Sequence, residues 1–148
     1  MGLYEKVSIS MINAMKNRDK ATLSTIRLLK SAIDLNKINN KLETVDDELV
    51  ISVASKQVKT HKEDIIEFEK VGRKDLVEGL KKEIKLLETF LPSQLTIEEI
   101  TSVIDDIFNT IKPEGKQDMG KIMKEANKRL NGKADFKQVS DIVNSKLN

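Results

Sequence analysis

Hydrophobic residues recur three and four positions apart along nearly the whole chain, which is the spacing of amphipathic helices. Stretches that alternate apolar and polar residues, as strands do, are almost missing, so the pattern predicts an all-α fold. The same spacing predicts the positions of six helices, over residues 3–16, 20–39, 45–71, 74–91, 119–130 and 136–147, and of another that follows Thr96 and carries an apolar stripe from Ile100 to Ile111.

Pro92 interrupts this pattern, because proline cannot donate a helical hydrogen bond and biases the residue before it away from helical dihedrals. Ser93 and Gln94 follow it as a polar linker. We therefore expect two helical domains, over residues 1–92 and 95–148. The first should be a helical bundle with a long antiparallel hairpin that turns at Gly72, and the second a small unit of three short helices.

The helix expected over residues 20–39 is apolar on two nearly opposite sides. One side carries Leu23, Ile26 and Ile33, and the other carries Ala21, Leu28, Ala32 and Leu35. A helix of this kind is typical of the centre of a bundle, so we expect this helix to be central in the first domain.

Capping residues mark the starts of several helices. Thr44 is expected to cap the third helix, and Asp118 and Asp135 the sixth and seventh. Thr96, followed three residues later by Glu99, has the form of a capping box for the fifth helix.

The chain has 148 residues, no cysteine and a single histidine. This composition excludes disulfides, thiolate zinc sites and cysteine nucleophiles, and it argues against a histidine metal site. His61 falls within the apolar stripe of the third helix, so we expect it in the core. Because the sequence also lacks a glycine-rich phosphate loop and a Ser/His/Asp arrangement, it predicts no catalytic residue, no cofactor and no metal.

No apolar run reaches the twenty or so residues that a membrane-spanning helix needs. The first thirty residues mix acidic with basic side chains, unlike a signal or transit peptide. Together with the lack of cysteine, this pattern predicts a cytoplasmic protein without a membrane partner.

Charge is distributed unevenly along the second domain. Residues 92–111 hold four acidic and no basic side chains, whereas residues 112–148 hold nine basic and five acidic ones. This concentration of basic residues favours a polyanionic partner, because contacts with phosphates need basic side chains gathered on one surface.

The helix over residues 119–130 separates its apolar and basic sides. Its basic side carries Lys121, Lys124 and Lys128, and Lys133 and Lys137 lie just beyond the following turn. We expect these five lysines to contact the phosphates of RNA. The alternative is an ordinary solvated helix face, whose field Glu125 would weaken.

The turn over residues 131–135 combines Gly132, Lys133 and Asp135 at the start of a helix. Free amides at a helix start can bind a phosphate. Asp135 would occupy some of those amides as a cap, so a purely structural connection agrees with the sequence equally well. With four phenylalanines and one tyrosine, the chain has few stacking platforms, so RNA contacts should be with backbone and shape.

Five short runs together point to a known family. In the first domain, AMKNRDKATLSTIRLLKSAI (14–33), EFEKVGR (67–73) and FLPSQL (90–95) resemble the YqeY-like proteins. In the second, DMGKIM (118–123) and GKAD (132–135) resemble the tail shared by that family and by the B subunit (GatB) of the tRNA-dependent amidotransferase. The residues that match the tail are Gly120, Lys121, Met123, Gly132, Lys133, Ala134 and Asp135.

The resemblance implies an N-terminal helical domain of unassigned role, joined to a tail of the type with which the amidotransferase engages tRNA. The catalytic body of the amidotransferase is not covered. The leading hypothesis is therefore a non-catalytic tRNA-binding accessory protein, acting alone or with an amidotransferase or an aminoacyl-tRNA synthetase. One alternative is a protein–protein adaptor whose third and fourth helices offer an apolar groove to a partner helix. Another is a component of a carbon–nitrogen ligase that uses glutamine as amide donor.

Overall fold

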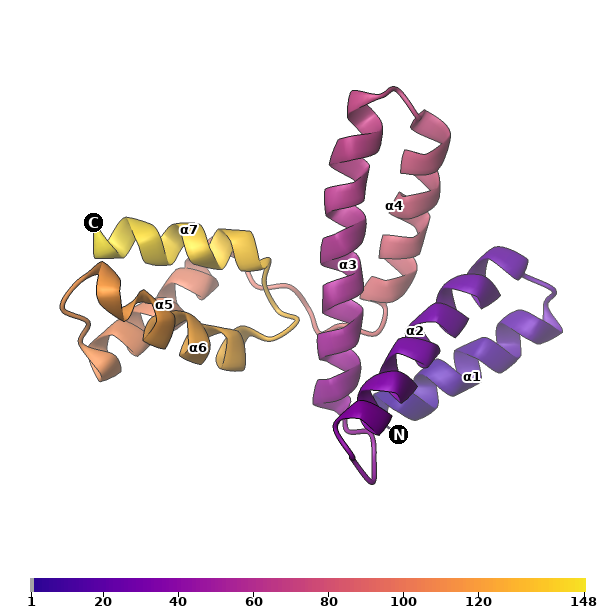
Figure 1. Cartoon of the computed structure of the whole chain (residues 1–148), viewed down its shortest axis with the longest axis horizontal. Coiled ribbons are helices and arrows are strands. Elements are labelled where there is room, and N and C mark those ends of the chain that lie inside the picture. Colours follow the sequence, from indigo (N-terminus) through magenta and orange to yellow (C-terminus); the bar gives the residue numbers. More distant parts are fainter. Residues whose placement is uncertain (1) are drawn as a thin grey trace. The chain divides into compact units, whose positions relative to one another are not determined.

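The structure is a computed structural model of the chain and describes residues 2–148. These residues form α1 (Leu3–Lys16), α2 (Lys20–Asn39), α3 (Asp47–Lys70), α4 (Lys74–Glu88), α5 (Ile97–Ile111), the 3-10 turn η1 (Lys116–Asp118), α6 (Met119–Leu130) and α7 (Phe136–Leu147) (Figure 1). The all-α prediction is confirmed, and residues 2–148 contain no strand. The chain divides into two compact units, one ending at Pro92 and one from Ser93 to Asn148, which are described separately.

The first unit is built from α1 to α4. α1 and α2 form one antiparallel pair, α3 and α4 form another, and α2 packs against α3 (Figure 1). All four helices contribute apolar side chains to its core. Among the most deeply buried, each at most 1% exposed, are Val7, Ile26, Ile33, Val50 and Leu87.

The start of α3 differs from the prediction. Asp46 caps the helix, because its carboxylate accepts a hydrogen bond from the amide of Leu49 (2.9 Å). Asp47 accepts another from the amide of Leu3 at the start of α1 (2.9 Å). Thr44 therefore does not cap α3. Threonine and aspartate are both good capping residues, and the periodic pattern does not distinguish two candidates so close together.

The turn between α3 and α4 lies where it was expected, whereas α4 ends early. Gly72 adopts a φ of +72°, a left-handed conformation that favours glycine. α4 continues through Gly79 and ends at Glu88, three residues before the predicted end. There the hydroxyl of Thr89 donates to a carbonyl of the preceding turn (2.7 Å), and Phe90 enters the core with 1% of its surface exposed.

α2 packs against α1, α3 and α4, as expected of a central helix, but only one of its two apolar sides is covered within the first unit. Ile26 and Ile33 are at most 1% exposed, but Leu28 and Leu35 are 61% and 57% exposed. The periodicity of the sequence shows that a helix face is apolar. Whether that face is buried depends on how many other helices pack around it. Four helices arranged as two pairs leave this side of α2 as an open apolar surface.

In the second unit α5, α6 and α7 each pack against the other two. Thr96 and Glu99 form the expected capping box: the Thr96 hydroxyl accepts from the amide of Glu99 (3.2 Å), and the Glu99 carboxylate accepts from the amide of Thr96 (3.1 Å). The core is formed by apolar side chains of the three helices, including Ile100, Ile104, Ile107, Ile122, Ala126 and Val143.

The start of α6 differs from the prediction, and that of α7 agrees with it. The turn η1 precedes α6, and the carboxylate of Asp118 accepts a hydrogen bond from the amide of Glu114 (2.9 Å). Asp118 therefore closes the preceding loop, and its side chain forms no capping hydrogen bond with α6. Asp135 does cap α7, because its carboxylate accepts from the amide of Lys137 (2.9 Å).

Among residues 2–148 no helix is both long and apolar enough to cross a bilayer. The same residues contain no group of three or more histidine or acidic side chains placed to hold a metal ion.

Candidate functional site

α6 directs its apolar side into the core of the second unit and its lysines into solvent. Lys121, Lys124 and Lys128 are all exposed. Because they lie three and four residues apart, they share one face of the helix. The buried residues of the opposite face are Ile122, Met123, Ala126 and Leu130.

Ion pairs neutralise little of this basic stripe. The carboxylate of Glu125, which was expected to weaken the field of the stripe, lies 3.1 Å from the guanidinium of Arg129. The ammonium of Lys121 is 3.8 Å from the carboxylate of Asp118, near the outer limit of an ion pair. Of the five candidate lysines, those that form no ion pair within residues 2–148 are Lys124, Lys128, Lys133 and Lys137.

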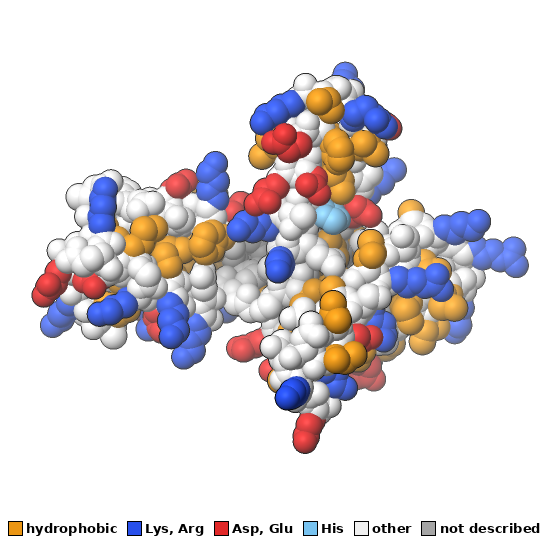
Figure 2. Space-filling view, viewed as in Figure 1, with side chains coloured by type: hydrophobic (Ala, Val, Ile, Leu, Met, Phe, Trp, Pro, Cys, Tyr) orange, Lys and Arg blue, Asp and Glu red, His pale blue; other side chains and the backbone are white. Residues whose placement is uncertain are grey.

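The second unit carries its opposite charges on different helices. α5 holds four acidic and no basic residues, whereas α6 holds four basic residues and one acidic residue. Two of the α5 carboxylates are already engaged, Glu99 in the capping box and Asp105 in an ion pair with Lys146 of α7. Blue side chains are spread over the visible face of this unit in Figure 2. Basic side chains are therefore four of the five charged residues of α6.

Hydrogen bonds fasten the turn between α6 and α7 to the segment before α5. The side-chain amide of Gln94 donates to the carbonyl of Gly132 (2.7 Å), and the amide of Leu95 donates to the carbonyl of Lys133 (2.8 Å). Because Asp135 also caps α7, the backbone here is engaged within the unit. This favours a structural role of the turn over a phosphate site at free amides, although the Lys133 side chain is exposed.

The remaining residues of the tail motif differ in position. Met123 lies in the core of the second unit and Ala134 packs against it, so both contribute to stability. Gly120, in the first turn of α6, is exposed, and a Cβ atom there would meet no heavy atom within 4 Å. The backbone beside the basic stripe is therefore open to an approaching ligand.

Phe136 is a candidate that the sequence pattern did not reveal. It is the first residue of α7 and 44% exposed, and it lies between Lys133 and Lys137 in the sequence. It therefore offers a partly exposed aromatic side chain at the start of α7. The position of an aromatic residue at a helix start can be read from the sequence, but its exposure depends on how α7 packs.

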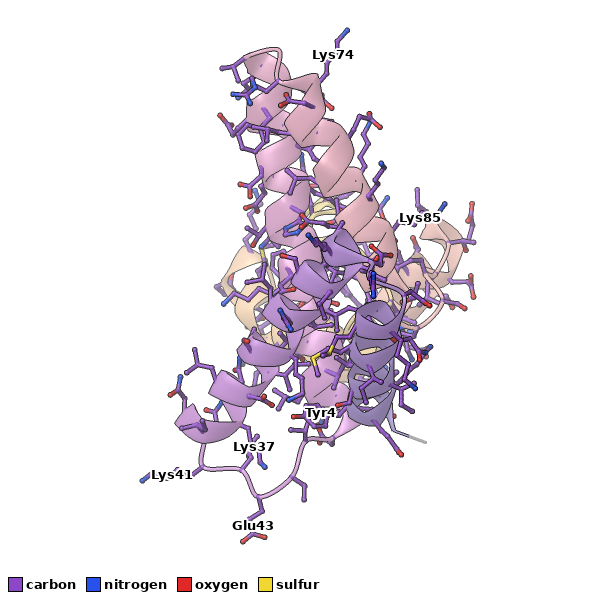
Figure 3. The ribbon with its side chains drawn as sticks, turned by 90° about the vertical axis from the view of Figure 1, so that its right-hand side faces the viewer. Tyr4, Lys37, Lys41, Glu43, Lys74 and Lys85 are labelled. Carbon is purple, nitrogen blue, oxygen red and sulfur yellow. The ribbon has the colours of Figure 1, made fainter. Side chains whose placement is uncertain are left out.

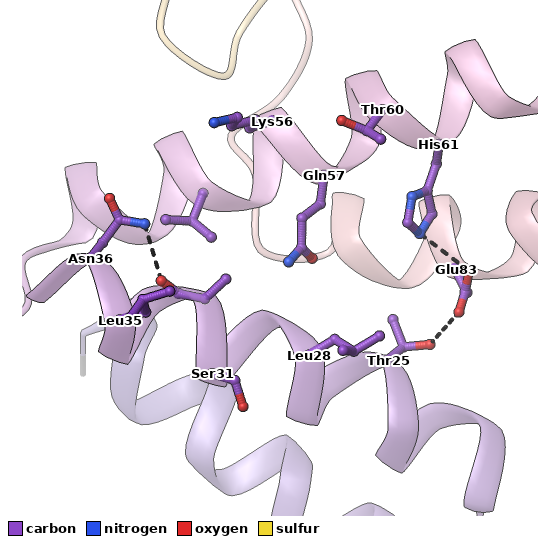
Figure 4. Close-up of a pocket in the computed structure, with 12 residues that line it drawn as sticks. Thr25, Leu28, Ser31, Leu35, Asn36, Lys56, Gln57, Thr60, His61 and Glu83 are labelled. Atoms are coloured by element: carbon purple, nitrogen blue, oxygen red, sulfur yellow. Dashed lines mark hydrogen bonds and ion pairs between the residues drawn. The ribbon is translucent and has the colours of Figure 1, made fainter. Parts of the chain in front are cut away.

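A groove of about 530 Å³ runs between α2 and α3 in the first unit (Figure 4). Leu28, Ala32 and Leu35 line it from α2, Val53 lines it from α3, and α4 contributes only Glu83. The adaptor hypothesis placed a groove between the third and fourth helices. This one lies instead along the uncovered side of α2.

His61 lies at one end of this groove and not in a closed core, so its predicted burial is only partly correct. Its side chain is 21% exposed, and its Nε2 is 3.2 Å from a carboxylate oxygen of Glu83. The other oxygen of Glu83 accepts a hydrogen bond from the hydroxyl of Thr25 (3.3 Å), so side chains of α2, α3 and α4 meet here (Figure 4). Nδ1 of His61 is buried and has no hydrogen-bond partner among the described residues.

A polar cluster joins α1 to α2 outside the groove. Asp34 accepts hydrogen bonds from the hydroxyl of Tyr4 (2.6 Å) and the ammonium of Lys30 (3.0 Å). Burial raises the pKa of Asp34, but the two hydrogen bonds outweigh it and hold that pKa below its ordinary value. The bonds to Asp34 and Tyr4 raise the pKa of Lys30. We interpret this cluster as structural.

Comparison with known proteins gives one family and several relatives. The family model described as Yqey-like protein matches residues 4–147. "Altered inheritance of mitochondria protein 41, mitochondrial" of Pyrenophora tritici-repentis is 26% identical over 149 residues, covering 95% of this chain and 81% of the relative. The protein of the same name from Kluyveromyces lactis is 36% identical over 77 residues, covering 52% of this chain and 42% of the relative. The protein of the same name from Vanderwaltozyma polyspora is 29% identical over 101 residues, which cover 67% of this chain and 55% of the relative.

Proposed function

The chain belongs to the YqeY-like family, and from this premise we propose that it is a non-catalytic RNA-binding accessory protein whose ligand is tRNA. The exposed lysines of α6 and of the turn that follows it would make the contact. Family membership names no ligand, so the proposal rests on the surface chemistry of the second unit.

The observation that carries the proposal is the unpaired basic stripe. Lys124 and Lys128 lie one helical turn apart, both exposed and both without an ion pair among residues 2–148. The carboxylate of Glu125 between them is held by Arg129. Two ammonium groups so placed can contact neighbouring phosphates of one strand.

The surface is better suited to the RNA backbone than to the bases. Phe136 is the one aromatic residue among the exposed large hydrophobic residues of the second unit, and an exposed aromatic side chain can stack on a base. Phosphate contacts would then supply most of the affinity, so binding should depend strongly on salt and weakly on sequence.

The choice of tRNA over other RNA comes from the resemblance of the tail to the domain with which the amidotransferase engages tRNA. The same resemblance makes an amidotransferase or an aminoacyl-tRNA synthetase the natural protein partner. Amide transfer from glutamine is not part of the proposal, because it belongs to the catalytic body of that enzyme. We place the protein in the cytoplasm. Its relatives carry "mitochondrial" in their names, and tRNA is present in both compartments.

Binding to tRNA at several salt concentrations tests the proposal. Fluorescein-labelled bulk tRNA is titrated with the full chain, and anisotropy gives the affinity at each KCl concentration. Each lysine that neutralises a phosphate contributes about 0.7 to 0.9 to the slope of log affinity against log salt. The triple variant Lys121→Ala, Lys124→Ala, Lys128→Ala should therefore flatten that slope by roughly two to three units. Its circular dichroism should not change, because alanine is a good helix former and the apolar side of α6 is untouched.

A matched triple variant removes the same charge from the other unit. Lys74, Lys82 and Lys85 are exposed on α4, and Lys74 and Lys85 extend outward from it (Figure 3). Replacing all three with alanine should leave the salt slope unchanged. The proposal fails if the wild type does not bind tRNA with at least micromolar affinity at low salt, if the α6 variant keeps the full slope, or if both variants lose affinity equally.

A further inference from the structure

The groove between α2 and α3 is an apolar surface that the first unit leaves open. Leu28 and Leu35 form its edge and are 61% and 57% exposed, and the more buried Ala32 and Val53 lie deeper. Figure 2 shows hydrophobic side chains near the pale-blue histidine that marks one end of the groove. Exposed apolar surface that forms a groove is typical of a binding site.

The dimensions of the groove suit a helix. Its α2 side runs from Thr25 to Asn36, a rise of about 16 Å. Leu28 and Leu35 are seven residues apart, which on a helix is about 10 Å. Residues i and i+7 on one face of a partner helix are separated by the same distance, and such residues are the usual anchors of helix-in-groove binding.

Charge complementarity indicates the chemistry of the partner. Lys56 of α3 lines the groove, is exposed, and forms no ion pair within residues 2–148. The one carboxylate in the lining, Glu83, already accepts a hydrogen bond from Thr25 and pairs with His61. The groove therefore has one unpaired positive charge, at Lys56, and its negative charge is engaged.

The lining also distinguishes a protein partner from RNA. None of the residues that line the groove is tyrosine, phenylalanine or tryptophan, so it has no surface on which a base could stack. Its exposed side chains include aliphatic leucines, which gain most by packing against other aliphatic side chains.

We propose that this groove binds an acidic amphipathic helix of a partner protein. Apolar side chains of that helix pack on Leu28 and Leu35, and a carboxylate of it faces Lys56. The side-chain amide of Gln57, which lies between α3 and α2 (Figure 4), offers a hydrogen-bonding group in the middle of the contact. This interaction uses the first unit and is independent of the RNA-binding proposal.

A library of displayed peptides tests the proposal directly. Yeast cells display random 18-residue helical peptides, the labelled full chain is the bait, and the Leu28→Glu, Leu35→Glu double variant is kept for the binding measurements that follow. Enriched sequences should carry apolar residues at i, i+3 or i+4 and i+7, with glutamate and aspartate beside them. A synthetic peptide of the enriched sequence should bind the wild type at least tenfold more tightly than the double variant. Lys56→Glu should weaken its binding at least threefold.

Ile66→Glu is the matched control, because Ile66 is 56% exposed on α3 but does not line the groove. Affinity for this variant should stay within twofold of wild type, and circular dichroism should show that all variants are folded. The proposal is overturned if enriched peptides are basic or lack the helical period, if they bind the double variant equally well, or if tRNA competes with them. It is also overturned if sedimentation shows a wild-type dimer that the double variant abolishes, because the occupant would then be a second copy of this chain.

Discussion

The side-chain amide of Gln94 donates a hydrogen bond of 2.7 Å to the carbonyl of Gly132, 38 residues further along the chain. The next residue, Leu95, donates its amide to the carbonyl of Lys133 (2.8 Å). These two bonds join the runs FLPSQL and GKAD, which the sequence presents as unrelated motifs. From Gln94 onward, the linker therefore belongs structurally to the second unit.

This arrangement predicts where a protease cuts first. Limited digestion with subtilisin should cleave near Ser93, which is exposed and lies between the end of α4 and the anchored Gln94. Mass spectrometry should find two fragments that meet near this residue, both helical by circular dichroism. Gln94→Ala should extend cleavage toward Thr96, whereas replacing the exposed Gln138 of α7 should not. A first cut inside α4 or α5 would contradict the division into two folding units.

Gly79→Ala should raise the free energy of unfolding by about 0.5 to 1 kcal/mol. Gly79 lies inside α4, and a Cβ atom there would meet no heavy atom within 4 Å, so alanine gains helix propensity without a clash. Gly72→Ala is the matched comparison, because space is also open there but φ is +72°. It should lower the free energy of unfolding by about 1 kcal/mol. Urea denaturation measures both, and a loss of stability in Gly79→Ala would argue against a regular α4.

Helix ends could be predicted from the sequence wherever one local signal decides them. Gly72 turns the chain after α3 through its own dihedral angle, and Thr96 and Glu99 cap α5 through bonds three residues apart. The start of α3 was harder, because Thr44 and Asp46 compete locally and the structure uses Asp46. Whether the second side of α2 is covered depends on the packing of distant helices, which local periodicity does not encode.

The candidate site shows the same division between local and long-range information. Exposure of Lys124 and Lys128 follows from helical spacing and an apolar opposite face, so it could be predicted. The engagement of Glu125 by Arg129 follows from the sequence as well, because an acidic residue four positions before a basic one is a favourable helix pair. The groove along α2, in contrast, could not be predicted, because the residues of α2 and α3 that line it come together only when the two helices pack.

The cluster around Asp34 makes stability depend on pH. Hydrogen bonds from Tyr4 and Lys30 outweigh burial and lower the pKa of Asp34 in the folded state below 3.8, its ordinary value. A carboxyl group whose pKa is lower in the folded than in the unfolded state stabilises the protein at pH values above its pKa in the unfolded state. That contribution is lost as pH falls through its pKa in the folded state.

Asp34→Asn should therefore cost more stability at pH 6 than below pH 3.8. Urea denaturation across this range tests it, and Tyr4→Phe should show a smaller change of the same sign. A pH-independent difference for Asp34→Asn would contradict the role of the two hydrogen bonds.

Gly120→Ala should separate the folding of the second unit from its binding of RNA. The substitution adds one methyl group in the first turn of α6, at an exposed position where Cβ meets no heavy atom within 4 Å. Alanine is favoured over glycine in a helix by up to about 1 kcal/mol, so the free energy of unfolding should rise. Thermal or urea unfolding of the full chain measures this change.

Affinity for tRNA should fall in the same variant, by roughly three- to tenfold, because the methyl group hinders the approach of a phosphate to the backbone beside Lys121. Asn127→Ala is the control, because Asn127 is exposed on the same helix and its replacement also raises helix propensity. It should gain stability and keep the wild-type affinity at every salt concentration. If Gly120→Ala gains stability and also keeps full affinity, the phosphates contact only the ends of the lysine side chains. The open backbone at Gly120 would then have no part in recognition.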